Sequence, residues 1–120
     1  METKQLTERL FAYGTLKSPE KRKEIFGVPI KSKRTFAKGI TLSSTVVPDD
    51  GTYKDIKSLD SSIIKGVVLE LTDEQLKLAD EYETSHYIRR RISLTDSTEA
   101  WVYQSIDRFE EELIKYGGKR

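Results

Sequence analysis

The chain of 120 residues contains no cysteine, which excludes disulfides, thiolate nucleophiles and thiolate metal ligands. A single histidine leaves little basis for a histidine-based metal site or a Ser-His-Asp triad. The net charge is only +1, so no global field points to nucleic acid or to a membrane surface. Any catalysis must therefore rest on carboxylates, tyrosines, lysines, arginines or backbone amides.

Long hydrophobic runs are also missing. No apolar run approaches the length that spans a membrane, and the N-terminal residues lack the apolar core of a secretory signal. We therefore expect a soluble, cytoplasmic protein, monomeric or a small homo-oligomer. The apolar residues that are present form periodic runs, which indicates a folded chain. This length fits one domain, expected over residues 1–120 with an ordered core from about 9 to 116.

The N-terminal pattern predicts a strand, a tight turn and a helix. The apolar run Leu10–Tyr13 reads as a buried strand that stops at Gly14. Ser18 is a favourable helix cap before a helix over Pro19–Phe26, and Gly27 ends that helix. Gly14 would let the backbone turn tightly and leave nearby amides free to bind an anionic group. An ordinary strand-to-helix turn is the alternative interpretation.

The remaining patterns predict a small α+β domain with about five strands, mostly antiparallel, and helices at the ends and between them. The expected elements are a strand over Lys33–Leu42, a long surface loop over Ser43–Asp60, a strand over Ile63–Leu71, a helix from Thr72 to about Tyr82, a hairpin of Tyr87–Ile92 with Ala100–Tyr103, and a terminal helix over Ser105–Tyr116. Tyr53 and Ile56 are the expected anchors of the loop. Gly66 marks a bulge or a close approach, and Thr72 with Gln75 has the spacing of a capping box.

Glu83 is the candidate proton carrier. It lies where the helical pattern gives way to a strand, between Tyr82 and Tyr87. Partial burial between aromatic rings raises the pKa of a carboxyl group and suits it to proton transfer near neutral pH. Asp80 and Glu81 fall within the helical pattern and read as solvated. The alternative is that Glu83 is itself an ordinary solvated carboxylate at a helix end.

Other polar residues carry weaker signals. Arg89, Arg90 and Arg91 could form a phosphate-binding patch, but strand alternation splits them between two faces. We therefore expect no nucleic-acid binding. His86 reads as a solvated turn residue, and Trp101 reads as a core residue.

Four segments occur in an order that is typical of one family. They are Leu10–Leu16, which ends in Tyr-Gly-Thr-Leu, then Gly66–Leu71, then Asp80–Glu83 with Tyr87 and Arg89 beyond it, and finally Ala100–Tyr103. In this order they resemble the γ-glutamylcyclotransferase-like family, over roughly Leu10 to Tyr103.

The resemblance implies a small mixed, mostly antiparallel β-barrel with flanking helices and a cavity at its mouth. Known relatives cyclise a γ-glutamyl group to 5-oxoproline and release an amine or amino acid, with no cofactor or metal. Carried over to this chain, Glu83 is the catalytic acid/base. The substrate-binding residues implied are Tyr13, Gly14, Thr15, Leu16 and Tyr87.

This chemistry needs few groups, because a γ-glutamyl compound carries its own nucleophile, the α-amine. One carboxylate can take a proton from that amine and later return it to the leaving nitrogen. Two positions depart from the family pattern: Thr84 replaces the usual glycine, and Lys54 follows Tyr53 where proline is common. A non-catalytic small-ligand-binding or regulatory domain that retains the family cavity is therefore the alternative function.

Overall fold

The computed structural model describes residues 6–47, 51–83 and 86–114, with only the main chain for residues 15, 45–47 and 51–53. The chain forms, in order, β1 (Glu8–Ala12), the short 3-10 helix η1 (Thr15–Lys17), α1 (Pro19–Phe26), β2 (Ser32–Val47), β3 (Gly51–Leu71), α2 (Asp73–Glu83), β4 (Tyr87–Leu94), β5 (Glu99–Ser105) and α3 (Ile106–Glu112). No helix within these described ranges is both long and apolar enough to span a membrane.

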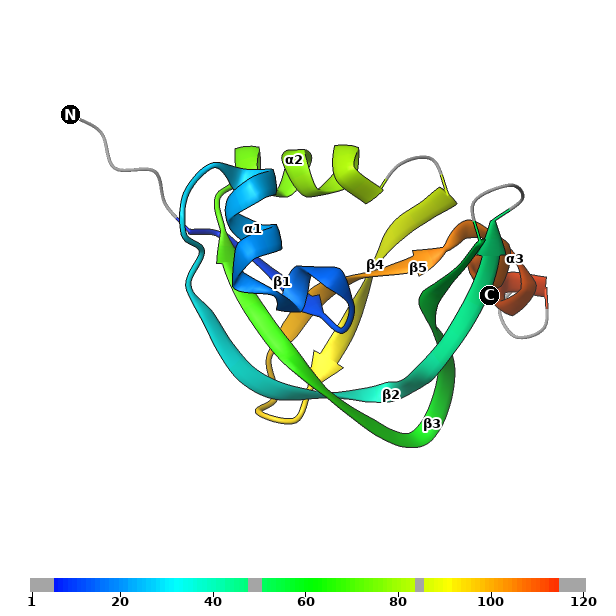
Figure 1. The fold of residues 1–120 in the computed structure, drawn as a ribbon. Helices are drawn as coiled ribbons and strands as arrows, with labels where there is room; N and C mark the ends of the chain where they lie inside the picture. The colour runs from blue at the N-terminus through cyan, green and yellow to red at the C-terminus, as the bar shows by residue number, and fades with distance from the viewer. Residues whose placement is uncertain (1–5, 48–50, 84–85, 115–120) are drawn as a thin grey trace.

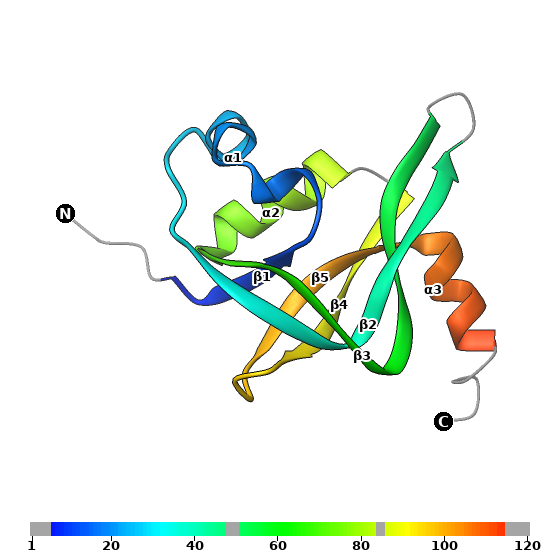
Figure 2. The ribbon, with the colours of Figure 1, turned by 60° about the horizontal axis from the view of Figure 1, so that its bottom comes forward.

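The five strands close into a barrel in the order β1-β3-β2-β4-β5. β1 and β5 run parallel where Leu10 pairs with Trp101, and the other neighbouring strands are antiparallel. Helices α1 and α2 lie together on one side of the barrel, and α3 lies on the other (Figures 1 and 2). The predicted small, mostly antiparallel α+β barrel with flanking helices is confirmed.

Alternating side chains on the strands supply two cores. Phe11 and Val68 point into the barrel, whereas their neighbours Leu10 and Leu69 face the helices. Successive strand residues point to opposite faces, so a strand covered on both sides reads as continuously apolar. This explains why the sequence around Val68 is apolar without alternation.

Gly66 is a point of close approach, as its position within an apolar strand predicted. A Cβ atom at residue 66 would lie 2.6 Å from the carbonyl oxygen of Ala12 and 2.6 Å from Cζ of Phe11. Real Cβ atoms do not come this close to backbone oxygens, so β1 and β3 can pack here only with glycine.

The long surface loop expected over Ser43–Asp60 is wrong. β2 continues to Val47, β3 begins at Gly51, and among the described residues the two strands pair from Ser43 with Asp55 to Val47 with Gly51. The arm that they form passes the start of β4 (Figure 2). Ile56 is fully buried, as expected for an anchor, while the Tyr53 side chain lies outside the described residues.

Local capping signals place the helix ends. The Thr72 N–H donates to Oε1 of Gln75 at 2.9 Å, and the Gln75 N–H donates to Oγ1 of Thr72 at 3.1 Å. Ser18 caps α1, and Gly27 ends it with a left-handed φ of 77°. α2 extends to Glu83, one residue beyond the predicted end. The end predicted for the terminal helix, Tyr116, lies outside the described residues.

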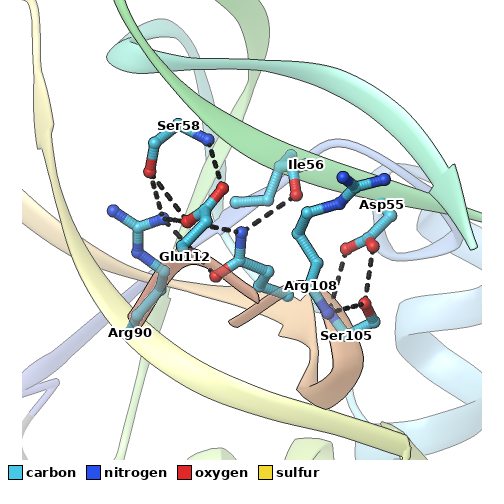
Figure 3. Close-up of polar contacts among 8 residues, drawn as sticks. Asp55, Ile56, Ser58, Arg90, Ser105, Arg108 and Glu112 are labelled. Carbon is cyan, nitrogen blue, oxygen red and sulfur yellow. Dashed lines mark hydrogen bonds and ion pairs between the residues drawn. The ribbon is translucent and has the colours of Figure 1, made fainter. Parts of the chain in front are cut away.

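Buried polar contacts hold α3 against β3 (Figure 3). Asp55 is fully buried and accepts hydrogen bonds from the Ser105 backbone N–H at 2.8 Å and the Ser105 hydroxyl at 2.7 Å. At the other end of α3, Glu112 accepts from the Ser58 N–H at 2.7 Å and pairs with Arg90 at 3.4 Å. Because these acceptors are desolvated, the charge-assisted bonds fix the helix on the strand.

We expect Gly66→Ala to lower the free energy of unfolding by roughly 2 kcal/mol, because the new methyl group overpacks the contact with Ala12 and Phe11. Urea denaturation measures this loss. Gly14→Ala is the matched control: its methyl group would meet only Cδ of Lys54, at 3.9 Å, so stability should change by less than about 1 kcal/mol. Equal stability of the two variants would contradict the close packing of β1 on β3.

Candidate functional site

Glu83 is the last residue of α2 and is half-buried. Burial raises the pKa of its carboxyl group from an ordinary value of 4.5 to about 7, with a smaller contribution from the negative charge of Asp80. The expectation of a raised pKa therefore holds, and the alternative of an ordinary solvated carboxylate does not. A carboxyl group with this pKa can both accept and donate a proton near neutral pH.

Asp80 fixes the end of α2 to the barrel. Its Oδ1 atom accepts hydrogen bonds from Nε of Arg89 at 2.7 Å and from the Tyr103 hydroxyl at 2.6 Å. The Arg89 guanidinium also lies 4.5 Å from the centre of the Trp101 ring. The expectation that Asp80 is simply solvated is wrong, whereas Glu81 is exposed as expected. The carboxylate that raises the pKa of Glu83 also positions the helix that carries it.

Tyr13, which follows β1, is joined to Tyr103, the hydrogen-bond partner of Asp80. Its hydroxyl donates a hydrogen bond of 2.6 Å to the carbonyl oxygen of Tyr103. Burial raises the pKa of Tyr13, and the nearby charges of Asp55, Tyr87 and Glu83 raise it further. Tyr13 is therefore a neutral phenol at physiological pH, within the electrostatic reach of Glu83.

Tyr103 also lies near charged side chains, those of Asp80 and Glu83. Burial raises its pKa most, followed by the hydrogen bond to Asp80 and the charges of Asp80 and Glu83. The neutral hydroxyls of Tyr13, just beyond β1, and of Tyr103, on β5, therefore both lie within the electrostatic reach of the Glu83 carboxyl group.

The segment from Gly14 to Lys17 turns as a short 3-10 helix, in which the Lys17 N–H donates to the Gly14 carbonyl at 3.0 Å. The tight turn was predicted, but Gly14 does not have the positive φ angle that would require glycine. The Leu16 side chain is buried in the core beneath the helices, so only its main chain could contact a ligand. The Thr15 side chain lies outside the described residues.

Arg22 supports this turn from α1. Its Nη1 atom donates to the carbonyl oxygens of Leu16 at 3.2 Å and Lys17 at 3.0 Å, and its Nη2 atom donates to Oγ of Ser32 at 3.3 Å. The side chain is buried, which is uncommon for arginine. Sequence reasoning missed this role because nothing local marks a helix-surface arginine as buried.

The β2–β3 arm brings Lys54 to the same region. The Tyr87 hydroxyl donates to the carbonyl oxygen of Lys54 at 3.0 Å. Cδ of Lys54 lies 3.9 Å from where a Cβ atom of Gly14 would be. The structure therefore places Lys54, predicted to lie in a loop, beside Gly14 and Tyr87. Tyr13 lies within the electrostatic reach of Tyr87 and Glu83.

The three consecutive arginines each have a carboxylate partner. Arg89 pairs with Asp80, Arg90 pairs with Glu112, and Arg91 pairs with Glu99 at 3.5 Å. These pairs neutralise much of the charge that a phosphate-binding patch would need. In the described part of the chain, no group of three histidine, aspartate or glutamate side chains is placed to hold a metal ion.

Residues 10–118 match the model of one protein family, described as Gamma-glutamyl cyclotransferase, AIG2-like. The chain belongs to this family. The match covers nearly the whole sequence, including the turn at Gly14 and the end of α2 at Glu83. The resemblance inferred from the four sequence segments is therefore confirmed.

Solved structures of similar fold agree with this membership. An Arabidopsis thaliana protein, known from a solution structure, matches with a TM-score of 0.73 and 18% identity, over 99% of this chain and 81% of its own. A protein titled Gamma-glutamyl cyclotransferase matches with a TM-score of 0.64 and 16% identity, over 82% of this chain and 66% of its own. An uncharacterised Pyrococcus horikoshii protein matches with a TM-score of 0.59 and 16% sequence identity, over 95% of this chain and 99% of its own. At these identities the likeness shows the shared fold.

No curated protein matches the sequence significantly.

The raised pKa of Glu83 predicts a pH-dependent stability. The folded chain holds this proton more tightly than the unfolded chain, so the stabilisation is full below pH 4.5 and is lost as the pH rises through 7. Between about pH 5 and pH 8, we expect the unfolding free energy of the wild type to fall by roughly 2 kcal/mol relative to Glu83→Gln. Urea denaturation over a pH series measures this difference.

Glu81→Gln is the control, because it removes an exposed carboxylate from the same helix. Its pH profile should follow that of the wild type. Parallel profiles for the wild type and Glu83→Gln would contradict the raised pKa.

Proposed function

We propose that this family member cyclises a γ-glutamyl amine or γ-glutamyl amino acid, releasing 5-oxoproline and the free amine or amino acid. The observation that carries the proposal is the half-buried Glu83, whose carboxyl group has a pKa of about 7 and lies within the electrostatic reach of Tyr13. The name of one structural neighbour, Gamma-glutamyl cyclotransferase, supports the same chemistry.

In the first step, the Glu83 carboxylate takes a proton from the substrate α-ammonium group. An α-amine is mostly protonated near pH 7, so it cannot attack until a base removes this proton. The positive charge of the bound ammonium favours the ionised form of Glu83, because opposite charges at close range lower a carboxyl pKa. Substrate binding thus increases the fraction of Glu83 that is ionised and able to accept the proton.

In the second step, the freed amine nitrogen attacks the γ-carbonyl carbon and a five-membered ring closes. The carbonyl electron pair moves to oxygen and returns as the bond from carbon to the leaving nitrogen breaks. Protonated Glu83 gives its proton to that nitrogen, and the restored carboxylate then takes the second proton from the ring nitrogen, which becomes the lactam N–H. The released amine accepts this second proton and leaves as an ammonium ion, so the Glu83 carboxylate is ionised again. One carboxyl group therefore serves both steps, with no change in oxidation state.

Ring closure also needs a substrate that is folded back on itself, because an intramolecular attack depends on the two reacting atoms being held together. In this proposal Tyr13 and Tyr87 border the substrate, and the main chain of Gly14, Thr15 and Leu16 holds it. The first amides of the short helix η1 cannot reach an intrahelical acceptor, so they can donate to a substrate oxygen. A cytoplasmic location and a monomer or small homo-oligomer stay predictions.

Glu83→Gln should lower 5-oxoproline release by at least about 100-fold, because glutamine cannot accept the ammonium proton. Chromatographic detection of 5-oxoproline from a panel of γ-glutamyl amines and γ-glutamyl amino acids measures this loss. Thermal unfolding should show that the variant is folded.

Glu81→Gln, on the exposed side of the same helix, should turn over as the wild type does. Unchanged turnover in Glu83→Gln would refute the assigned role. A wild-type protein that binds γ-glutamyl compounds but releases no 5-oxoproline would instead support the non-catalytic alternative.

A further inference from the structure

Lys54 is a cation held beside the candidate site by a well-fixed main chain. Its carbonyl oxygen accepts the Tyr87 hydroxyl, and its residue pairs with Ser44 across the β2–β3 ladder. The next residue, Asp55, is fully buried and bound twice by Ser105. The backbone at Lys54 is therefore restrained on both sides, and its exposed side chain starts from a defined place over Gly14.

No carboxylate neutralises Lys54 within the part of the chain that the structure describes. Two other cations in this region are paired: Lys21 with Glu24 at 3.4 Å, and Arg89 with Asp80. Many surface lysines lack an ion pair, so this feature alone would mean little. What distinguishes Lys54 is its place against Gly14 and Tyr87.

A second positive charge contacts the same turn. Arg22 is buried, donates to the carbonyl oxygens of Leu16 and Lys17, and forms no ion pair among the described residues. Glu20 interacts with Arg22 electrostatically without forming an ion pair with it, so the buried guanidinium still adds positive potential to its surroundings. The turn from Gly14 to Lys17 therefore has an exposed cation near its first residue and a buried cation bound to its last two carbonyl groups, which favours an anionic ligand there.

We propose that Lys54 is a substrate-binding residue whose ammonium group pairs with a carboxylate of the γ-glutamyl substrate. This inference rests on the proposed function. Every γ-glutamyl compound carries the glutamyl α-carboxylate, and γ-glutamyl amino acids carry a second carboxylate on the leaving group. Both have the chemistry that the ammonium group recognises, so the experiment must separate them.

The test measures binding rather than turnover, in a Glu83→Gln background that arrests the reaction. Isothermal titration gives the Kd of γ-glutamyl-ethylamide, which has one carboxylate, and of γ-glutamyl-alanine, which has two. Adding Lys54→Met should weaken binding about fivefold, the scale of one partly exposed ion pair, and the loss should shrink at high salt. Lys54→Arg should retain the affinity.

The two ligands identify the carboxylate. A loss of affinity for both ligands assigns Lys54 to the glutamyl α-carboxylate, and a loss for γ-glutamyl-alanine alone assigns it to the leaving group. Unchanged affinities for both would overturn the inference. Lys57→Met is the matched control: it removes the same charge from an exposed position on β3, three residues away and so on the opposite face of the strand.

Turnover by the wild type separates this inference from the proposed function. If the wild type releases 5-oxoproline but Lys54→Met binds both ligands normally, only the role of Lys54 fails. If the wild type releases none but binds both ligands through Lys54, only the catalytic proposal fails. Absence of binding by every variant would overturn both.

Discussion

The contact on which the candidate site depends is the pair of hydrogen bonds that Asp80 accepts from Arg89 and Tyr103. These bonds join the last turn of α2 to β4 and β5, and so determine where Glu83 lies. The same carboxylate adds a negative charge beside Glu83 and supports the pKa that burial has already raised. Asp80 therefore fixes the position of the helix end and adds to a proton affinity that is raised mainly by burial.

β3 links this region to the far side of the barrel. Its residue Lys54 lies over Gly14, while the next residue, Asp55, is buried and caps the start of α3 through Ser105. Neighbouring residues of one strand thus contact the candidate site and the C-terminal helix. Asp55 therefore both holds the start of α3 and contributes to the raised pKa of Tyr13.

Local signals in the sequence predicted local structure well. The capping residues Thr72 and Gln75 are close in sequence. Gly66 was recognised because it interrupts an otherwise apolar strand, at a place where β1 approaches closely. The β2–β3 arm was missed because its residues are polar and its order comes from backbone pairing, which side-chain patterns do not record. The partners of Asp80 were missed for a related reason: Tyr103 lies 23 residues further along the chain, and only the closed barrel brings the two together.

The division of β1 between two cores has a consequence for how this chain can change. Leu10 and Ala12 fill the layer under the helices, while Phe11 and Tyr13 fill the barrel interior. Deleting or inserting a single residue here would exchange the two sets and turn the Tyr13 hydroxyl away from β5. Substitutions in this strand can therefore change side-chain size, whereas insertions and deletions would disrupt the alternation of the two sets. Homologous chains should thus align through the strand without gaps.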